Sequence, residues 1–310
     1  MSGRVVSINI SEKKGTAKHG VERAEVSLRG MDGDAHSGTW HRQISLLAHE
    51  EVERFVKKTG RSTAHGEFAE NITTGGLDLS RVKLFHRLHI GSVELEVTQL
   101  GKKCHNEPGG SGNSCAIFRD VGSCIMPVHG IFARVLSAGS IKTGDEIGHR
   151  SVPIKCKIIT LSDRAACGEY DDLSGPRIVE CLEAARFGFD LGCSREVIAD
   201  ERARLEESIS GADADIIFTT GGTGIGPRDI TPETILSLCP KTIPGIMEHI
   251  RQKHAARIPS ALLSRSVAAV YGDRTLVFAL PGSVKAVTEY MEEIIPLIEH
   301  AVLMLRGIGH

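Results

Sequence analysis

Residues 219–233, with the sequence TTGGTGIGPRDITPE, constrain the fold of this 310-residue chain more than any other stretch. The apolar run at 214–218 precedes them and is typical of a buried strand. After the glycines, Thr231 is a good N-cap, Pro232 suits the first helical position, and Glu233 lies in the first turn. The stretch therefore predicts a strand, a glycine-rich loop and the start of a helix.

The composition of this loop suits an anionic ligand. Glycine allows a ligand to approach the backbone closely, and both turn N–H groups and a helix N-terminus favour negative charge. The loop glycines are Gly221, Gly222, Gly224 and Gly226, and the hydroxyls are those of Thr219, Thr220 and Thr223. Arg228 and Asp229 add one charge of each sign, so the loop suits phosphates with a divalent cation held by the carboxylate. On pattern alone, a plain turn between a strand and a helix is the alternative. The glycine spacing is neither that of a Walker A loop nor that of the dinucleotide fingerprint.

The second half of the chain resembles the molybdopterin adenylyltransferase family of the MogA/MoaB type. The central stretch reads TTGGTG followed by RDITPE, which is similar to the family signature. Other matching motifs stand in the family's order: LSDR at 161–164, DLSGP at 172–176, IADE at 198–201, PG at 244–245 with Glu248 and Arg251, LSR at 263–265, and LPG at 280–282. Several motifs in the right order are far more specific than any one of them.

This resemblance implies transfer of AMP from ATP to the terminal phosphate of molybdopterin, with release of pyrophosphate. It implies that Asp200 and Asp229 are catalytic and hold Mg²⁺. The implied binding residues for substrate and cofactor are Ser162, Asp163, Thr220, Gly221, Gly222, Thr223, Gly224, Arg228, Ser264, Arg265, Pro281 and Gly282, with Lys285 as a further candidate. The residues themselves leave simpler roles open, because Asp200 could cap the next helix and Asp229 could support the helix start at Thr231.

Length and composition indicate two soluble domains. A chain of 310 residues suggests two at roughly 150 residues each, and residues 151–153 are the predicted seam. Hydrophobic residues at 41% are ordinary for a soluble globular protein. A net charge of -2 implies no general attraction to nucleic acid. No apolar run approaches the roughly 20 residues of a membrane span, and the N-terminus lacks a signal-peptide core. The 8 cysteines form no CxxC pair, which favours free thiols in a reducing cytoplasm.

The first half, 1–150, predicts an all-β domain of barrel type, because many short strands alternate with glycines. Expected strands are 4–10, 25–28, 43–47, 88–90, 93–97 and several within 135–147, with a helix at 50–58. Cys104-His105, Cys115, Cys124, His36 and His41 are candidate metal ligands, but the cysteines lack the spacing of a structural zinc site. Cys104 stands apart because Lys102 and Lys103 favour its thiolate, which is a nucleophile and a soft-metal ligand.

This half resembles the MOSC domain, named for the C-terminal domain of molybdenum cofactor sulfurases. The matching pieces are GDAH at 33–36, WHRQ at 40–43, FAENI at 68–72, TQ at 98–99 with KCH at 103–105, GIFARV at 130–135 and GD at 144–145. The family cysteine, which carries sulfur or ligates molybdenum, falls on Cys104. Sulfurases obtain the sulfur from a pyridoxal-phosphate domain, and this chain contains no counterpart of that domain.

The second half, 153–310, predicts an α/β three-layer domain with a mainly parallel sheet. Expected strands are 154–161, 196–198, 214–218, 266–271 and 275–280, and expected helices are 174–186, one carrying Leu205 and Ile209, and one from 284. Ligands bind at the carboxyl ends of strands in such sheets. We therefore expect Ser162, Asp163, Asp200 and the glycine loop to lie at one edge.

Together these features predict a cytoplasmic enzyme of molybdenum cofactor biosynthesis that adenylates molybdopterin with ATP and Mg²⁺. The MOSC-like half would bind, sulfurate or modify the cofactor through Cys104. Expected partners are the pterin, the nucleotide and other cofactor-biosynthesis proteins or molybdoenzymes, without nucleic acid or membrane. By resemblance, the second half forms a homo-oligomer, a trimer. Two alternatives stay open: a non-catalytic carrier or scaffold for the cofactor, and a sulfurating enzyme centred on Cys104.

Overall fold

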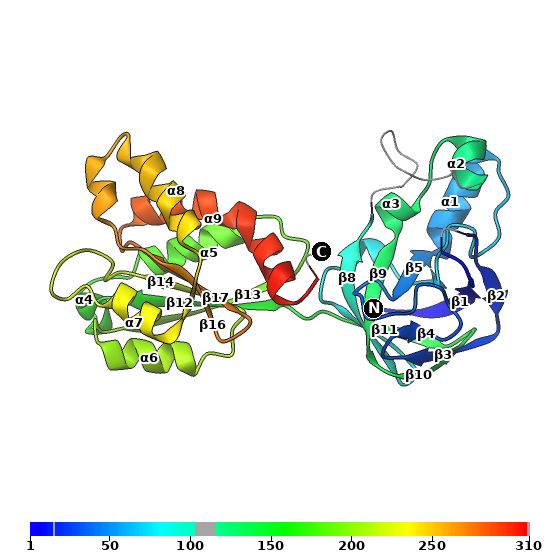
Figure 1. Ribbon diagram of the computed structural model, residues 1–310, viewed down its shortest axis with the longest axis horizontal. Coiled ribbons are helices and arrows are strands. Elements are labelled where there is room, and N and C mark those ends of the chain that lie inside the picture. The colour runs from blue at the N-terminus through cyan, green and yellow to red at the C-terminus, as the bar shows by residue number, and fades with distance from the viewer. Residues whose placement is uncertain (15, 103–115, 309–310) are drawn as a thin grey trace. The chain divides into compact units, whose positions relative to one another are not determined.

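The structure is a computed structural model that describes residues 1–14, 16–102 and 116–308. The chain divides into two compact units, which are described separately (Figure 1). Unit 1 comprises Met1–Pro153 together with Gly188–Asp190. Unit 2 comprises Ile154–Phe187 and Leu191–His310.

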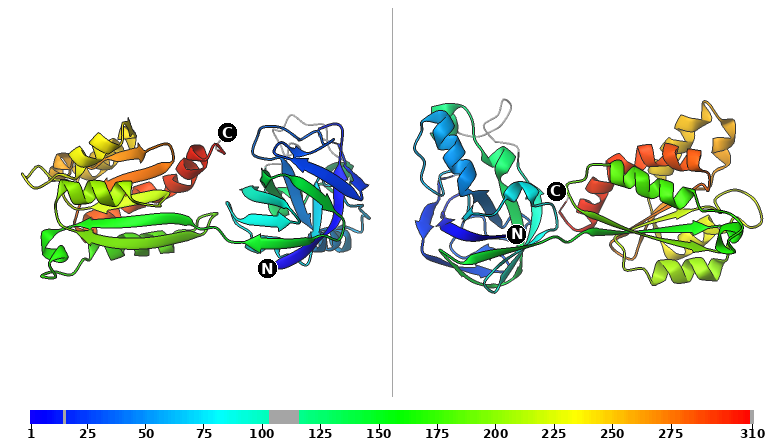
Figure 2. Two further views of the ribbon diagram at one scale, coloured as in Figure 1. Left: turned by 90° about the horizontal axis from the view of Figure 1, so that it is seen from below. Right: turned by 180° about the vertical axis from the view of Figure 1, so that it is seen from behind.

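Unit 1 is a closed β-barrel, as predicted (Figure 2). Its larger sheet has the order β11-β7-β8-β9-β5-β6-β1-β2, and a further pairing of β1 with β11 closes it. A smaller sheet has the order β10-β3-β4. The strands are β1 (Ser2–Ile10), β2 (His19–Val21), β3 (Arg23–Ser27), β4 (Gly30–Met31), β5 (Ile44–Ala48), β6 (Ile72–Gly75), β7 (Arg87–Ile90), β8 (Val93–Leu100), β9 (Ile131–Ser137), β10 (Gly139–Lys142) and β11 (Glu146–Arg150).

Short helices lie outside this barrel. They are α1 (His49–Thr59), the 3₁₀ turn η1 (Leu79–Arg81), α2 (Ala116–Val121) and α3 (Met126–His129). Val52 and Phe55 of α1 are buried at helical spacing and join a cluster with Leu47 of β5 and Phe68. The α1 helix ends at Gly60, whose left-handed φ of 71° a residue without a Cβ adopts at little cost. The apolar period seen in the sequence thus fixes the helix against the end of β5.

Unit 2 is an α/β domain whose sheet has the order β13-β12-β14-β17-β16-β15. Its strands are β12 (Ile154–Leu161), β13 (Leu191–Ile198), β14 (Ile216–Thr220), β15 (Lys241–Thr242), β16 (Ala268–Tyr271) and β17 (Thr275–Leu280). The pairings from β13 to β17 are parallel, whereas β16 pairs antiparallel with both β17 and β15. The sheet is therefore mainly parallel, as predicted, and its antiparallel strands at one side make it mixed. The turn at Gly272 joins β16 directly to β17, and so short a connection forces an antiparallel pair.

Helices cover both faces of this sheet (Figure 1). They are α4 (Asp163–Ala166), α5 (Ser174–Ala184), α6 (Arg202–Ser210), α7 (Thr231–Leu238), α8 (Pro244–Ala255), the 3₁₀ turn η2 (Pro259–Leu263) and α9 (Val284–Leu305). Leu205 and Ile209 of α6 and Ile235 of α7 share a buried cluster with Ile159 and Ile217 of the sheet. The α5, α8 and α9 helices lie on the other side (Figure 1). Among the described residues, no helix is both long enough and apolar enough to cross a bilayer.

Candidate active site

The carboxyl ends of four parallel strands meet at one edge of the unit 2 sheet, as expected. Ser162 follows β12, Asp200 comes shortly after β13, Gly221 follows β14 and Pro281 follows β17. Neighbouring ends are joined by the N–H of Ser162, which donates to the Ile198 carbonyl at 3.0 Å. The Thr220 hydroxyl likewise donates to the Pro281 carbonyl at 2.9 Å. The loops that carry the predicted site are therefore fixed to one another.

Two glycines allow the loop after β14 to fold. Gly221 has a φ of 106°, and a Cβ there would lie 2.3 Å from the Leu161 carbonyl oxygen. Gly222 has a φ of 62°, and a Cβ there would lie 2.6 Å from the Thr231 hydroxyl. That hydroxyl donates to the Gly221 carbonyl at 2.9 Å. Side chains at either glycine would meet both a left-handed backbone and a filled space.

Thr231 is not the N-cap of α7, so that prediction was wrong. The helix begins at Thr231, Ile230 takes the capping position, and no side chain caps the helix. The physical reason is that the Thr231 hydroxyl is already engaged with the Gly221 carbonyl. Pro232 does lie in the first turn, where its missing N–H costs nothing.

Asp229 lies inside the loop and helps to hold its shape. Its Oδ2 accepts a hydrogen bond from the Gly226 N–H at 2.7 Å. A Cβ on Gly224 would lie 2.7 Å from the same oxygen. The glycines at 224 and 226 thus let the backbone wrap around this carboxylate.

Asp200 pairs with Asp163, the first residue of α4, rather than with the helix α6 that follows it. The Asp163 N–H donates to Oδ2 of Asp200 at 3.2 Å, and the Asp200 N–H donates to Oδ1 of Asp163 at 3.0 Å. Glu201 takes the capping position of α6 without a side-chain bond, so the simpler reading of Asp200 as a cap was wrong. Burial, and then the charge of Asp229, raises the pKa of Asp200 above its ordinary value. Arg228 forms an ion pair with Asp163 and brings one cation to this group.

The Arg265 side chain binds backbone carbonyls of the glycine loop. Its Nε donates to the Gly224 carbonyl at 2.6 Å and its Nη2 to the Asp229 carbonyl at 2.7 Å, and it also pairs with Glu233. Ser264 lies beside it and bonds with Ser266 at 3.0 Å and with the Tyr290 hydroxyl at 2.9 Å. These two predicted ligand residues therefore have structural partners that tie the loop to the rest of the unit.

A pocket of about 450 Å³ borders the loop. It is lined by Arg202, Ile225, Gly226, Pro227, Asp229, Ile230, Glu233, Thr234 and Arg265. Arg202 was missed in the sequence, because one arginine at the start of a helix carries no signal without its neighbours. Asp172 was quoted only as part of a motif, yet it accepts hydrogen bonds from Thr160, Ser174 and Gly175 and fixes the start of α5.

The carboxylates of this edge suit Mg²⁺ only together with a phosphate ligand. Among the residues that the structure describes, no three His, Cys, Asp or Glu side chains come together as a metal site. Mg²⁺ is commonly held by one or two carboxylates, with water and substrate phosphates completing its six ligands. Asp200 and Asp229 lie close enough for the charge of Asp229 to raise the pKa of Asp200, and a shared cation would relieve that repulsion.

In unit 1, Cys104 lies outside the described residues. The motif residues of the first half nevertheless come together around a small pocket of about 100 Å³. It is lined by His36, Trp40, Arg42, Ser45, Ala69, Asn71, Lys102 and Phe132. The Arg42 guanidinium lies 4.7 Å from the Trp40 ring centroid, and its buried Nε has no hydrogen-bond partner among the described residues. Arg42 was quoted in a motif but given no role, and its position gives this pocket a cation.

A buried ion pair fixes the motif at 33–36, which supplies His36 to this pocket. Lys18 and Asp34 form the pair, and both side chains are fully buried. Asp34 also accepts hydrogen bonds from the N–H groups of Ser11 and His36, each at 3.0 Å. Although burial alone would raise the pKa of Asp34, bonds from His36 and Lys18 hold it well below its usual range. The residue keeps its charge, and the loop keeps its shape.

Comparison with known proteins gives matches to both halves. Residues 157–300 match the family described as a probable molybdopterin binding domain, and residues 33–148 match the MOSC domain. A molybdopterin adenylyltransferase of Helicobacter pylori (strain J99) is 37% identical over 154 residues, which are 48% of this chain and 86% of the relative. A molybdenum cofactor biosynthesis bifunctional protein of Synechococcus elongatus is 33% identical over 210 residues, covering 60% of this chain and 64% of the relative. A solved structure of the molybdopterin biosynthesis enzyme MoaB from Thermus thermophilus is 34% identical, with a TM-score of 0.45, covering 50% of this chain and 97% of that one.

Proposed function

Since the chain belongs to the molybdopterin adenylyltransferase family and carries a MOSC domain ahead of the family's domain, we propose that unit 2 transfers AMP from Mg-ATP to molybdopterin at the edge that holds Asp200 and Asp229. In this step a terminal phosphate oxygen of molybdopterin attacks the α-phosphorus of ATP. The new P–O bond forms as the bond to pyrophosphate breaks. The observation that carries the proposal is the approach of two carboxylates beside a glycine loop shaped for phosphate.

The residues of this edge have different roles in the transfer of AMP. Phosphoryl-type transfer depends mainly on positioning and on neutralising charge. The loop N–H groups and the Thr223 hydroxyl cradle phosphate oxygens, and Arg228 supplies a positive charge, while the Thr220 hydroxyl is bound to the Pro281 carbonyl and holds the loop in place. Arg265 is bound to the carbonyls of Gly224 and Asp229, so it positions the loop and leaves direct phosphate contact to its neighbours.

Asp200 and Asp229 would hold Mg²⁺, which supplies charge neutralisation at the phosphates. Asp229 is fixed by the Gly226 N–H, and Asp200 is fixed by the backbone of Asp163. Because both carboxylates are held in place before a ligand arrives, little reorganisation is needed on binding. Ser162, Ser264, Pro281, Gly282 and Lys285 stay candidates for contact with the pterin or nucleotide.

The test is to incubate the full chain with molybdopterin and Mg-ATP and to follow adenylated product and pyrophosphate. Asp229→Asn keeps the size of the side chain and an acceptor for Gly226, so the fold should survive. We expect the rate to fall by roughly 100-fold or more, as when one preorganised electrostatic group is removed. Asp273→Asn, on an exposed turn of the same unit, is the matched control and should keep the full rate. A near-normal rate in Asp229→Asn would refute the assignment, and a wild-type chain that only binds the pterin would indicate a carrier.

For unit 1, we propose that the pocket with Arg42 binds an anionic group of the cofactor and that Cys104 carries sulfur or ligates molybdenum. The support is the orphaned Nε of Arg42, the neighbouring Lys102 and the basic sequence around the cysteine. An anion in this pocket would give Arg42 the partner that it lacks among the described residues. The location of the reaction in the cytoplasm and the trimer stay predictions from the sequence.

Two measurements test the role of Cys104. With iodoacetamide at neutral pH, Cys104 should alkylate faster than exposed Cys167, because nearby lysines stabilise the thiolate. Cys239 is the slow reference, since burial raises the pKa of its thiol to about 11. Cys104→Ser should lose bound molybdenum and keep adenylation. If Cys104 labels no faster than Cys167 and the variant retains the metal, the first half is a structural or partner-binding module.

A further inference from the structure

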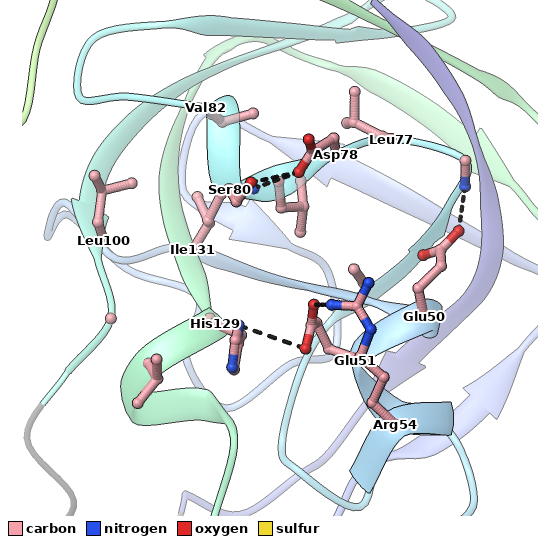
Figure 3. A pocket seen from close by; sticks show the side chains of 16 residues that line it. Glu50, Glu51, Arg54, Leu77, Asp78, Ser80, Val82, Leu100, His129 and Ile131 are labelled. Carbon is pink, nitrogen blue, oxygen red and sulfur yellow. Dashed lines mark hydrogen bonds and ion pairs between the residues drawn. The ribbon is translucent and has the colours of Figure 1, made fainter. Parts of the chain in front are cut away.

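A second pocket of about 730 Å³ lies in unit 1 and contains none of the residues of the Arg42 pocket. It is framed by the first turn of α1, the segment from Gly76 through η1, the end of β8 and the start of β9 (Figure 3). Strands β5 and β6 also end at it, at Ala48 and just before Gly76. None of the sequence motifs singled out for catalysis supplies an acidic residue to it.

The charged side chains around this pocket are mainly carboxylates. Glu50 and Glu51 come from α1, and Asp78 comes from the turn before η1 (Figure 3). Arg54 and His129 both face Glu51: Arg54 forms an ion pair with it, and Nδ1 of His129 lies 3.6 Å from its Oε2. Among the described residues, neither Glu50 nor Asp78 has an ion-pair partner. The side chains that line the pocket therefore sum to a net negative charge of about two, with Arg81 of η1 acting on Asp78 from outside the lining, and this charge disfavours phosphates and other anions.

Glu50 offers an acceptor atom that the fold does not use. Its Oε1 accepts a hydrogen bond from the Gly76 N–H at 2.7 Å, which fixes the carboxylate against the pocket wall. Its Oε2 is buried and has no hydrogen-bond partner among the described residues. A buried acceptor without a donor costs free energy, and a ligand with an N–H group would supply the donor.

The spacing of the acidic groups argues for an organic ligand and against a metal ion. Within the described parts of the chain, no three acidic, histidine or cysteine side chains come together as a metal site. The remaining wall is apolar, formed by Leu77, Leu79, Val82, Leu100, Val128 and Ile131. Leu100 is 41% exposed and Val128 is 74% exposed. A ligand that covered them would bury apolar surface, which is favourable.

We propose that this pocket binds a small organic cation, with an ammonium or amidinium group on an apolar body, through Glu50. The cationic group donates to the free Oε2 of Glu50. Asp78 adds long-range attraction, because bonds from Ser80 hold its pKa below the ordinary value and keep it ionised at neutral pH. The apolar body lies against the wall that carries Leu100 and Val128. This activity is separate from cofactor adenylation and does not depend on it.

Benzamidine is the probe, because it joins an amidinium to a flat apolar ring, and benzoate is its matched anion. Each is titrated into the full-length chain by calorimetry, up to about 10 mM, the range of weak fragment binding. We expect saturable binding of benzamidine at one site, from which benzoate does not displace it. No saturation by benzamidine, or displacement of benzamidine by benzoate, overturns the proposal.

Two variants place the binding in this pocket. Glu50→Gln keeps the bond to Gly76 and removes the charge, so affinity should fall at least about tenfold. Val128→Arg adds a cation at an exposed position of the rim, where it competes with the probe and spares the core. Glu12→Gln is the control, because it removes an exposed carboxylate elsewhere in the unit and should leave affinity unchanged. Wild-type affinity in either pocket variant overturns the proposal, and if Glu50→Gln fails to fold, Val128→Arg decides alone.

Discussion

At the scale of single residues, the edge of the unit 2 sheet that carries the candidate site holds a carboxylate whose charged form is unfavourable for folding. Asp200 is half-buried beside Asp229, and burial, followed by that charge, raises its pKa above the ordinary value. An apo chain at neutral pH therefore holds an unfavourable carboxylate. A site that must attract a cation needs such a group, because relief of this repulsion adds to the affinity for the cation.

Asp200→Asn should therefore stabilise the apo chain at about pH 7. When folding raises the pKa of a carboxyl group, the group contributes fully to the free energy of unfolding below its unfolded pKa of about 3.9. That contribution is lost as the pH rises through the pKa of the folded state. Asparagine does not titrate and still accepts from the Asp163 N–H. The melting temperature of the variant minus that of the wild type should rise between about pH 4 and pH 7. Adding Mg-ATP should raise the melting temperature of the wild type more than that of Asp200→Asn. An equal or lower melting temperature of the variant at neutral pH would contradict this account.

The partner of a side chain was harder to predict than the element near which the residue lies. The sequence placed Asp200 and Thr231 at helix starts, where either is a common cap, and both use their side chains elsewhere. Capping propensity describes a residue in the absence of tertiary partners. Here Asp163 and Gly221, which lie 37 and 10 residues away in the chain, provide those partners. A single sequence does not show which distant backbone group will compete for a side chain.

At the scale of elements, the glycine loop is the most demanding part of unit 2. Gly221→Ala should destabilise the unit by about 2 kcal/mol or more, since it combines a left-handed φ with a contact of 2.3 Å to backbone. Gly245→Ala is the matched control in α8, where a Cβ meets nothing within 4 Å. It should stabilise by about 0.5–1 kcal/mol through the unfolded state. Thermal denaturation of the two variants measures both shifts, and shifts in the same direction would contradict the argument.

In unit 2, the sequence predicted the edge strand β13 too short. Residues 196–198 were expected, but β13 runs over Leu191–Ile198 and is exposed along most of its length. Its residues show no apolar alternation, because neither face of an edge strand needs to be fully buried. The buried strands β12 and β14 were placed to within two residues, since both their faces carry apolar side chains. Within the sheet of unit 2, burial therefore decided how well each strand could be predicted.

At the scale of the whole molecule, patterns and motifs predicted the fold class, the barrel and the edge where the loops meet. They did not predict the pocket of Glu50 or the position of Arg42. Each pocket is lined by residues that are distant in sequence, such as Ala48, Gly76 and Gly130 around Glu50, and Asn71 and Phe132 around Arg42, and no local pattern marks their meeting. The antiparallel β16 has a local origin instead, because the short turn that joins it to β17 forces the two strands to run in opposite directions.

The two units should also act independently, because each has a core of its own, even though the short segment Gly188–Asp190 of the later chain belongs to unit 1. The barrel core and the sheet core share no residue, and all the residues proposed for adenylation lie beyond Ile154. A protease site inserted between Ser151 and Val152 should be cut without loss of adenylation, because the polar segment there buries little apolar surface. Adenylation is measured before and after the cut, and mass spectrometry confirms the position. Light scattering of the purified C-terminal piece should give a trimer. Loss of activity on cutting would show that the units work together, and a monomeric piece would refute the predicted trimer while leaving the chemistry of Asp200 and Asp229 intact.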